Sequence, residues 1–183
     1  MGGIFTTQNQ TVDKAPLSIC TLSRESLGVQ CGGAWMAAVA SQAWSLANRS
    51  ILVPFTVTSP FTFSKLAYRT GSGPTGNIDI GVYNSSFARI VSSGSTAVGG
   101  ASSLINVTVT TTTLVPGQYY FALAADNTSV TIGSSPFSDD AYARGSGLVY
   151  RDSTFPLPAT MATPVNTNLS ASWGVPFIQA TSL

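Results

Sequence analysis

Residues Thr75–Val98 read TGNIDIGVYNSSFARIVSSGSTAV, and this stretch decides the fold class. Its first half alternates apolar and polar residues, as a strand with one buried face does. The inward apolar residues are Ile78, Ile80 and Val82. Asn84-Ser85-Ser86 is typical of a turn, and Phe87–Val91 has the composition of a returning strand. The stretch therefore predicts a β-hairpin, with Asn77 and Asp79 pointing outward.

Further short strands are predicted on both sides of this hairpin, separated by turns rich in Gly, Pro, Asn and Ser. They are Ile51–Val57, Phe61–Tyr68, Ile105–Val109, Gln118–Asp126, Val130–Ile132 and a closing strand at Val175–Gln179. Pro54 indicates a sheet edge or a bulge, and the alternation slips by one residue between Phe63 and Leu66, as at a β-bulge. The set predicts an all-β fold, an antiparallel β-sandwich or jelly roll.

The chain divides into three parts by pattern. Residues 1–33 are polar and irregular with no sustained period, and we expect them to form an N-terminal arm. Residues 34–50 are a linker in which the helix formers of Ala34–Asn48 favour one short helix. Residues 51–183 carry the strand and turn pattern and form the β-sandwich domain.

Composition excludes several function classes. Charged residues make up 8% of the 183 residues, with a net charge of +1, against about 25% in an average soluble protein. Such a surface suits a protein that packs against neighbours in a large assembly, or one displayed outside a cell. Lys and Arg are scattered singly, which predicts no nucleic-acid binding. The absence of an apolar run of about 20 residues predicts no membrane span.

The ionisable residues predict no enzyme. The chain has no histidine, and histidine is the commonest general base and metal ligand. The acids are Asp13, Glu25, Asp79, Asp126, Asp139, Asp140 and Asp152. Asp79 with Asp126 is the alternative catalytic pair. Asp139, Asp140 or Asp152 is the alternative calcium site, but hydrated loops with turn-forming Asp are the favoured interpretation of these three residues. We expect no catalytic, cofactor-binding or metal-binding residue and no cofactor.

Two further groups of side chains have a structural and a functional interpretation. Trp35, Trp44, Trp173 and the tyrosines could stack on sugar rings, but buried core aromatics are the default. Asp79 lies near Arg69 and Arg89 in sequence and is expected in a structural ion pair. Cys20 and Cys31 form no C-x-x-C motif, so they are either two free thiols or a disulfide that closes the loop between them.

Four stretches resemble proteins encoded by tailed bacteriophages. They are SLANRSILVPF (Ser45–Phe55), TGNIDIGVYNSSFARIVSSGSTAV, PGQYYFALAADNT (Pro116–Thr128) and STFPLPAT (Ser153–Thr160). The resemblance covers most of the chain, from Ser45 to Thr160, and leaves residues 1–33 outside. It implies a virion component of β-sandwich type on the head or the tail, and it carries no catalytic residue to any position.

From composition and resemblance together we expect an accessory structural protein of a virion, assembled in the host cytoplasm. A capsid decoration or cement protein is the first expectation, acting as a homo-oligomer, a trimer, bound to the major capsid protein or other virion subunits. The alternative is a tail- or fibre-associated module that binds a receptor or glycan. A third interpretation is a secreted carbohydrate-binding domain that accompanies an enzyme.

Overall fold

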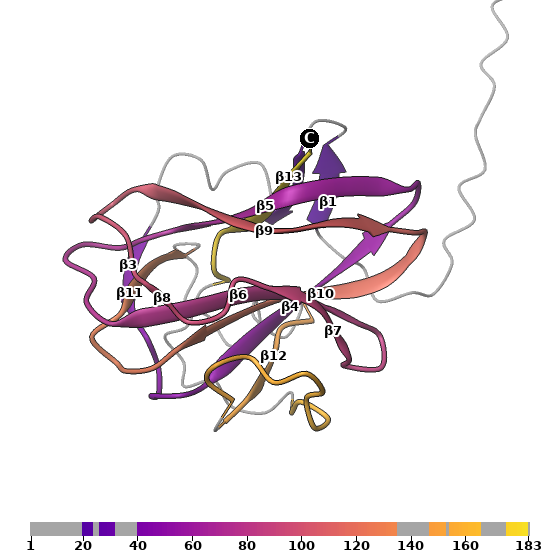
Figure 1. Ribbon diagram of the computed structural model, residues 1–183. Helices are drawn as coiled ribbons and strands as arrows, with labels where there is room; N and C mark the ends of the chain where they lie inside the picture. Colours follow the sequence, from indigo (N-terminus) through magenta and orange to yellow (C-terminus); the bar gives the residue numbers. More distant parts are fainter. Residues whose placement is uncertain are drawn as a thin grey trace, which may run out of the picture.

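The computed structural model describes residues 20–23, 26–31, 40–134, 147–152, 154–165 and 175–182. These residues form thirteen strands, all paired antiparallel, with no helix among them. Two large sheets lie face to face, with the hydrophobic core between them (Figure 1). The predicted all-β antiparallel sandwich is therefore confirmed, whereas the jelly roll stays a prediction. In the described part of the chain, no helix is long and apolar enough to cross a membrane.

Sheet one has the strand order β1-β2-β13-β5-β9. Its strands are β1 (Cys20–Ser23), β2 (Ser26–Cys31), β13 (Ile178–Ser182), β5 (Phe61–Arg69) and β9 (Leu104–Leu114). The predicted slip in β5 is confirmed, because Phe63 and Leu66 both lie in the core and the pairing with β13 shifts at Ser64. The closing strand also exists, three residues later than predicted, in the middle of the sheet.

Sheet two has the strand order β12-β4-β10-β6-β7, and the short β8 (Thr96–Ala97) also pairs with β6. Its strands are β12 (Val149–Arg151), β4 (Ser50–Val57), β10 (Gly117–Ala125), β6 (Asn77–Asn84) and β7 (Arg89–Ser92). The predicted hairpin is confirmed as β6 and β7. β12 pairs with β4 only at Ser50–Leu52. Pro54 lies past the end of β12, where no described strand pairs with that side of β4 and a missing N–H is tolerated.

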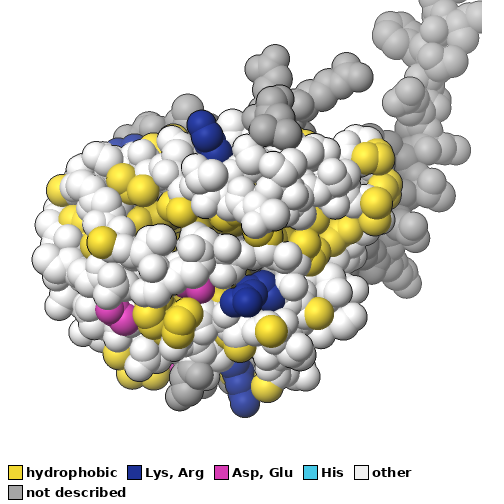
Figure 2. Space-filling view, viewed as in Figure 1, with side chains coloured by type: hydrophobic (Ala, Val, Ile, Leu, Met, Phe, Trp, Pro, Cys, Tyr) yellow, Lys and Arg dark blue, Asp and Glu magenta, His cyan; other side chains and the backbone are white. Residues whose placement is uncertain are grey.

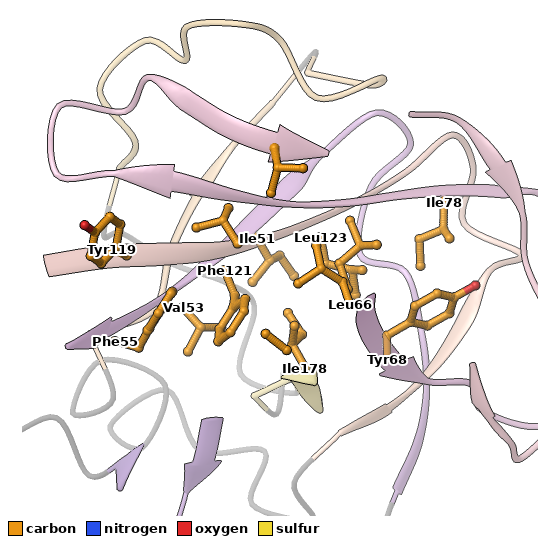
Figure 3. Close-up of a cluster of buried hydrophobic side chains, with 14 of the residues drawn as sticks. Ile51, Val53, Phe55, Leu66, Tyr68, Ile78, Tyr119, Phe121, Leu123 and Ile178 are labelled. Carbon is orange, nitrogen blue, oxygen red and sulfur yellow. The ribbon is translucent and has the colours of Figure 1, made fainter. Parts of the chain in front are cut away.

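The core is built from the inward faces of both sheets. Figure 3 shows β4, β5, β6, β10 and β13 contributing to a single cluster. Phe55 and Phe121 stack with their ring centroids 4.1 Å apart, and Tyr119 and Leu123 continue the same face of β10. Each fully buried aliphatic or phenyl side chain contributes about 1.5–3 kcal/mol relative to exposure. The alternating residues found in the sequence therefore hold the two sheets together.

Part of the segment predicted as a helix forms a strand of a small third sheet. Residues Ala40–Ala43 form β3, which pairs with β11 (Thr131–Ser134), and the chain then turns at Asn48 with a φ of 60°. Trp44 packs into the core between these segments. The helix expected over Ala34–Asn48 is wrong in its described part, because pairing with β11 and burial of Trp44 outweigh the helix propensity of the alanines. Residues 34–39 lie outside the described residues.

The N-terminal arm needs a correction in its described part. Residues 20–23 and 26–31 are not irregular: they form the hairpin β1–β2, which adds to sheet one through β13. Segments of four and six residues are too short to show a period in the sequence, so only the pairing with β13 identifies them. Cys20 and Cys31 occupy directly opposite positions of this hairpin. Residues 1–19, 24–25 and 32–33 lie outside the described residues.

Candidate functional site

Asp79 points away from the main core, as predicted, and it is nevertheless buried. It does lie on the outer face of β6, but its side chain is 0% exposed. Segment Thr154–Met161, here called the strap, crosses this face, below sheet two in Figure 1. The Leu157 N–H donates to Asp79 Oδ2 at 2.9 Å, and the hydroxyls of Ser93 and Ser92 donate to its two oxygens at 3.2 and 3.4 Å. Asp79 therefore fastens the strap to the sheet.

Three further contacts hold the strap. The Tyr83 hydroxyl donates to the Pro158 carbonyl at 2.6 Å, the Arg89 N–H donates to the Ala159 carbonyl at 2.8 Å, and the Met161 N–H donates to the Phe87 carbonyl at 2.9 Å. A second apolar cluster lies beneath: Leu52, Tyr83, Ala122, Ala124, Leu157 and Met161. Both faces of sheet two are therefore buried where the strap crosses it.

Gly81 allows β7 and the strap to lie close to β6. A Cβ at this position would lie 2.6 Å from the Val91 carbonyl oxygen and 3.1 Å from Leu157 Cδ1. The first of these contacts is with backbone, which cannot move aside cheaply. Any side chain at position 81 would therefore push β7 and the strap away from β6.

Burial controls the electrostatics of this region. Desolvation raises the pKa of the Asp79 carboxyl, and the hydrogen bonds from Leu157, Ser92 and Ser93 and the charge of Arg89 oppose this. The Arg89 guanidinium donates to the Leu157 carbonyl, not to Asp79. The described residues contain one ion pair, Arg49 with Asp152, so the predicted pair of Asp79 with Arg69 or Arg89 is not formed.

The other acids in the described part have structural partners. Asp126 accepts hydrogen bonds from the Asn77 backbone N–H at 2.9 Å, the Asn77 amide at 2.7 Å and the Asn127 amide at 2.7 Å. Asp152 pairs with Arg49 at 2.6 Å. Asp79 and Asp126 thus have separate sets of partners. Within the described ranges no three acidic or cysteine side chains gather as metal ligands. Asp13, Glu25, Asp139 and Asp140 lie outside those ranges.

The candidate sugar-stacking aromatics are largely buried. Trp44 is 2% exposed, and its indole Nε1–H donates to the Arg49 carbonyl at 3.0 Å. Tyr68, Tyr83 and Tyr119 are buried as well. The structural interpretation is confirmed for these four residues. Trp35 and Trp173 lie outside the described residues.

The most unusual exposed feature in the described part is the edge of sheet one that β9 forms. β9 is its last strand, and β5 is the one described strand that pairs with it. Its sequence LINVTVTTTTL contains no charge, proline or glycine. The outward side chains from Leu104 to Thr110 are exposed, while Ile105 and Val107 on the core side are only half-buried. We call the outer backbone of Leu104–Leu114, with these side chains, the β9 edge.

Exposed apolar side chains concentrate near this edge. The large exposed hydrophobic residues in the described part are Leu46, Ile90, Leu104, Val115 and Val165. Leu104 begins β9, Val115 follows it, and Ile90 lies on β7, which contacts β9 across the side of the sandwich. Figure 2, viewed as Figure 1, shows hydrophobic side chains along the seam between the sheets and few charges around them. The surface beside the β9 edge is therefore apolar, with few charged side chains.

No family model, no curated protein and no solved structure matches this chain.

Proposed function

We propose that this protein is an accessory structural component of a bacteriophage virion, most simply a decoration or cement protein that binds the shell as a homo-oligomer. The phage assignment rests on the resemblance of Ser45–Thr160. The observation that carries the structural role is the β9 edge, eleven uncharged residues at the border of a rigid sandwich. Shell subunits and further copies of the chain are the proposed partners.

Binding through such a surface is physically straightforward. An exposed strand offers backbone N–H and C=O groups to a strand of a partner, and the side chains beside it set the specificity. In β9 those side chains are Thr, Val, Ile, Leu and Asn, so the contacts are hydrogen bonds and apolar packing. The proposal contains no catalytic step, because Asp79, Asp126 and Asp152 already have structural partners.

Quantitative proteomics of purified phage particles tests the proposal. A cement protein is expected at a copy number comparable with that of the major shell subunit. A few copies per particle would instead favour the tail- or fibre-associated module that binds a receptor or glycan. Absence of the protein from purified particles would contradict both virion roles.

A further inference from the structure

We propose that the β9 edge is a self-association surface, at which two copies of this chain pair antiparallel about a two-fold axis through Val107. This goes beyond the proposed function, because it assigns the β9 edge to a second copy and gives the register and symmetry of the oligomer. Residues Leu104–Thr110 of each copy would align over their full length, so sheet one would continue across both copies.

Among the described residues, the β9 edge lacks the features by which natural proteins prevent edge strands from pairing with other chains. Short length, Lys or Pro on the edge, and covering segments are the usual protection. β9 is eleven residues long and carries neither charge nor proline. Exposed and more buried positions alternate from Leu104 to Thr110, and the alternation breaks at Thr111, where a second exposed threonine follows. The regular stretch available for pairing is therefore Leu104–Thr110.

The side chains of this stretch complement themselves. In an antiparallel pair, directly opposite residues point to the same face. An axis at Val107 places Ile105 opposite Val109 of the second copy, and Val107 opposite itself. These β-branched residues lie on the core side, where Ile105 and Val107 are only half-buried in one copy. On the outer side Asn106 lies opposite Thr108, a pair of uncharged hydrogen-bonding groups.

No charge repulsion opposes a second copy as the occupant. Self-pairing of a charged strand sets like charges against each other, which is destabilising, but β9 has none. The neighbouring strand β5 carries Lys65 and Arg69, opposite Thr108 and Leu104. In the paired form these side chains and their copies would be separated by three strand spacings, about 14 Å. That exceeds the screening length of about 8 Å at physiological salt.

Pairing of one edge with itself is isologous, so it closes at two copies. The trimer expected from the sequence needs two different surfaces on each chain, and the measured mass of the oligomer distinguishes the two. We expect light scattering after size exclusion, on the purified full-length chain in the micromolar range, to give the mass of a dimer. A monomer throughout that range, or a trimer, would overturn the inference.

Three double variants test the register. Asn106→Lys with Thr108→Lys places lysine opposite lysine twice, and we expect a monomer. Asn106→Glu with Thr108→Lys places glutamate opposite lysine twice, and we expect the dimer to persist. Ala162→Lys with Thr163→Lys adds the same charge as the first variant at exposed residues after the strap, and we expect a dimer. Circular dichroism and thermal melting confirm that each variant is folded.

A dimer of unchanged stability in N106K/T108K would overturn the inference, as would a monomer in A162K/T163K or in N106E/T108K. These masses are measured on purified protein, so they test the dimer independently of the virion proposal. A monomeric wild type would contradict only the dimer, and absence of the protein from particles would contradict only the virion proposal.

Discussion

At the scale of single residues, Asp79 shows how a polar side chain organises an apolar region. Its carboxylate lies under the strap and accepts hydrogen bonds from Leu157, Ser92 and Ser93. The Leu157 N–H lies in the strap and donates to Asp79 instead of to a backbone carbonyl of a neighbouring strand. Asp79 takes the place of such a partner, and this explains an ionisable residue in a fully buried position.

Removal of this acceptor should weaken the fold. In Asp79→Ala the Leu157 N–H stays buried without an acceptor, and an unsatisfied buried group costs about 1–3 kcal/mol. We expect the free energy of unfolding in urea to fall by about that amount. Asp79→Asn keeps an acceptor oxygen at the same place and should lose much less. Equal stability of the alanine variant and the wild type would show that Asp79 does not hold the strap.

Asp79 also gives stability a definite pH dependence. Burial raises the pKa of its carboxyl above the usual value of 3.8, so the folded state binds the proton more tightly than the unfolded state. The contribution of this group to stability is then fully present below the unfolded pKa and is lost as pH rises through the folded pKa. Asp79→Asn cannot titrate, so its stability relative to the wild type should increase from acidic to neutral pH. A constant difference across that range would contradict the raised pKa.

At the scale of elements, the sequence predicts strands well because a period of two survives wherever one face is buried. Ile78, Ile80 and Val82 marked β6, and the change of phase between Phe63 and Leu66 marked the bulge of β5. The period reveals which residues share a face, but it cannot reveal what covers that face. Asp79 was therefore placed correctly on the outer face, whereas its burial under the strap was not predicted.

The strap and the position of β9 depend on contacts that are distant in the sequence. The strap has no period of its own, and Asp79 and Tyr83, more than seventy residues away, hold it in place. Gly81 was the one local signal, because a glycine inside an alternating strand indicates a close approach of other backbone. The strand pattern of β9 was clear, but its place at the sheet edge follows from its single pairing with β5.

The hairpin β1–β2 makes the role of the N-terminal residues testable. The described side chains of the main core all come from Trp44 or later. Deletion of residues 1–33 should therefore leave a β-rich protein that melts cooperatively, with β13 exposed as a new edge. We expect its incorporation into particles to fall strongly. Loss of cooperative melting would make the hairpin a necessary part of the sandwich, and normal incorporation would place attachment on the sandwich itself.

At the scale of the whole molecule, the protein combines a well-packed interior with a surface almost free of charge. The eight basic and seven acidic residues are spread over 183 positions, and the described part contains a single ion pair. We propose that a chain of this kind associates through backbone hydrogen bonds and apolar contacts. Such contacts are insensitive to salt, which screens exposed charges beyond about 10 Å at 0.1 M.

The central claim is that this protein acts by assembly on a virion through uncharged contacts. The most direct test is its copy number per phage particle, relative to the major shell subunit, before and after a wash in molar sodium chloride. We predict a copy number comparable with that of the shell subunit and unchanged by the wash. Absence from the particles, or loss of the protein in high salt alone, would contradict the claim.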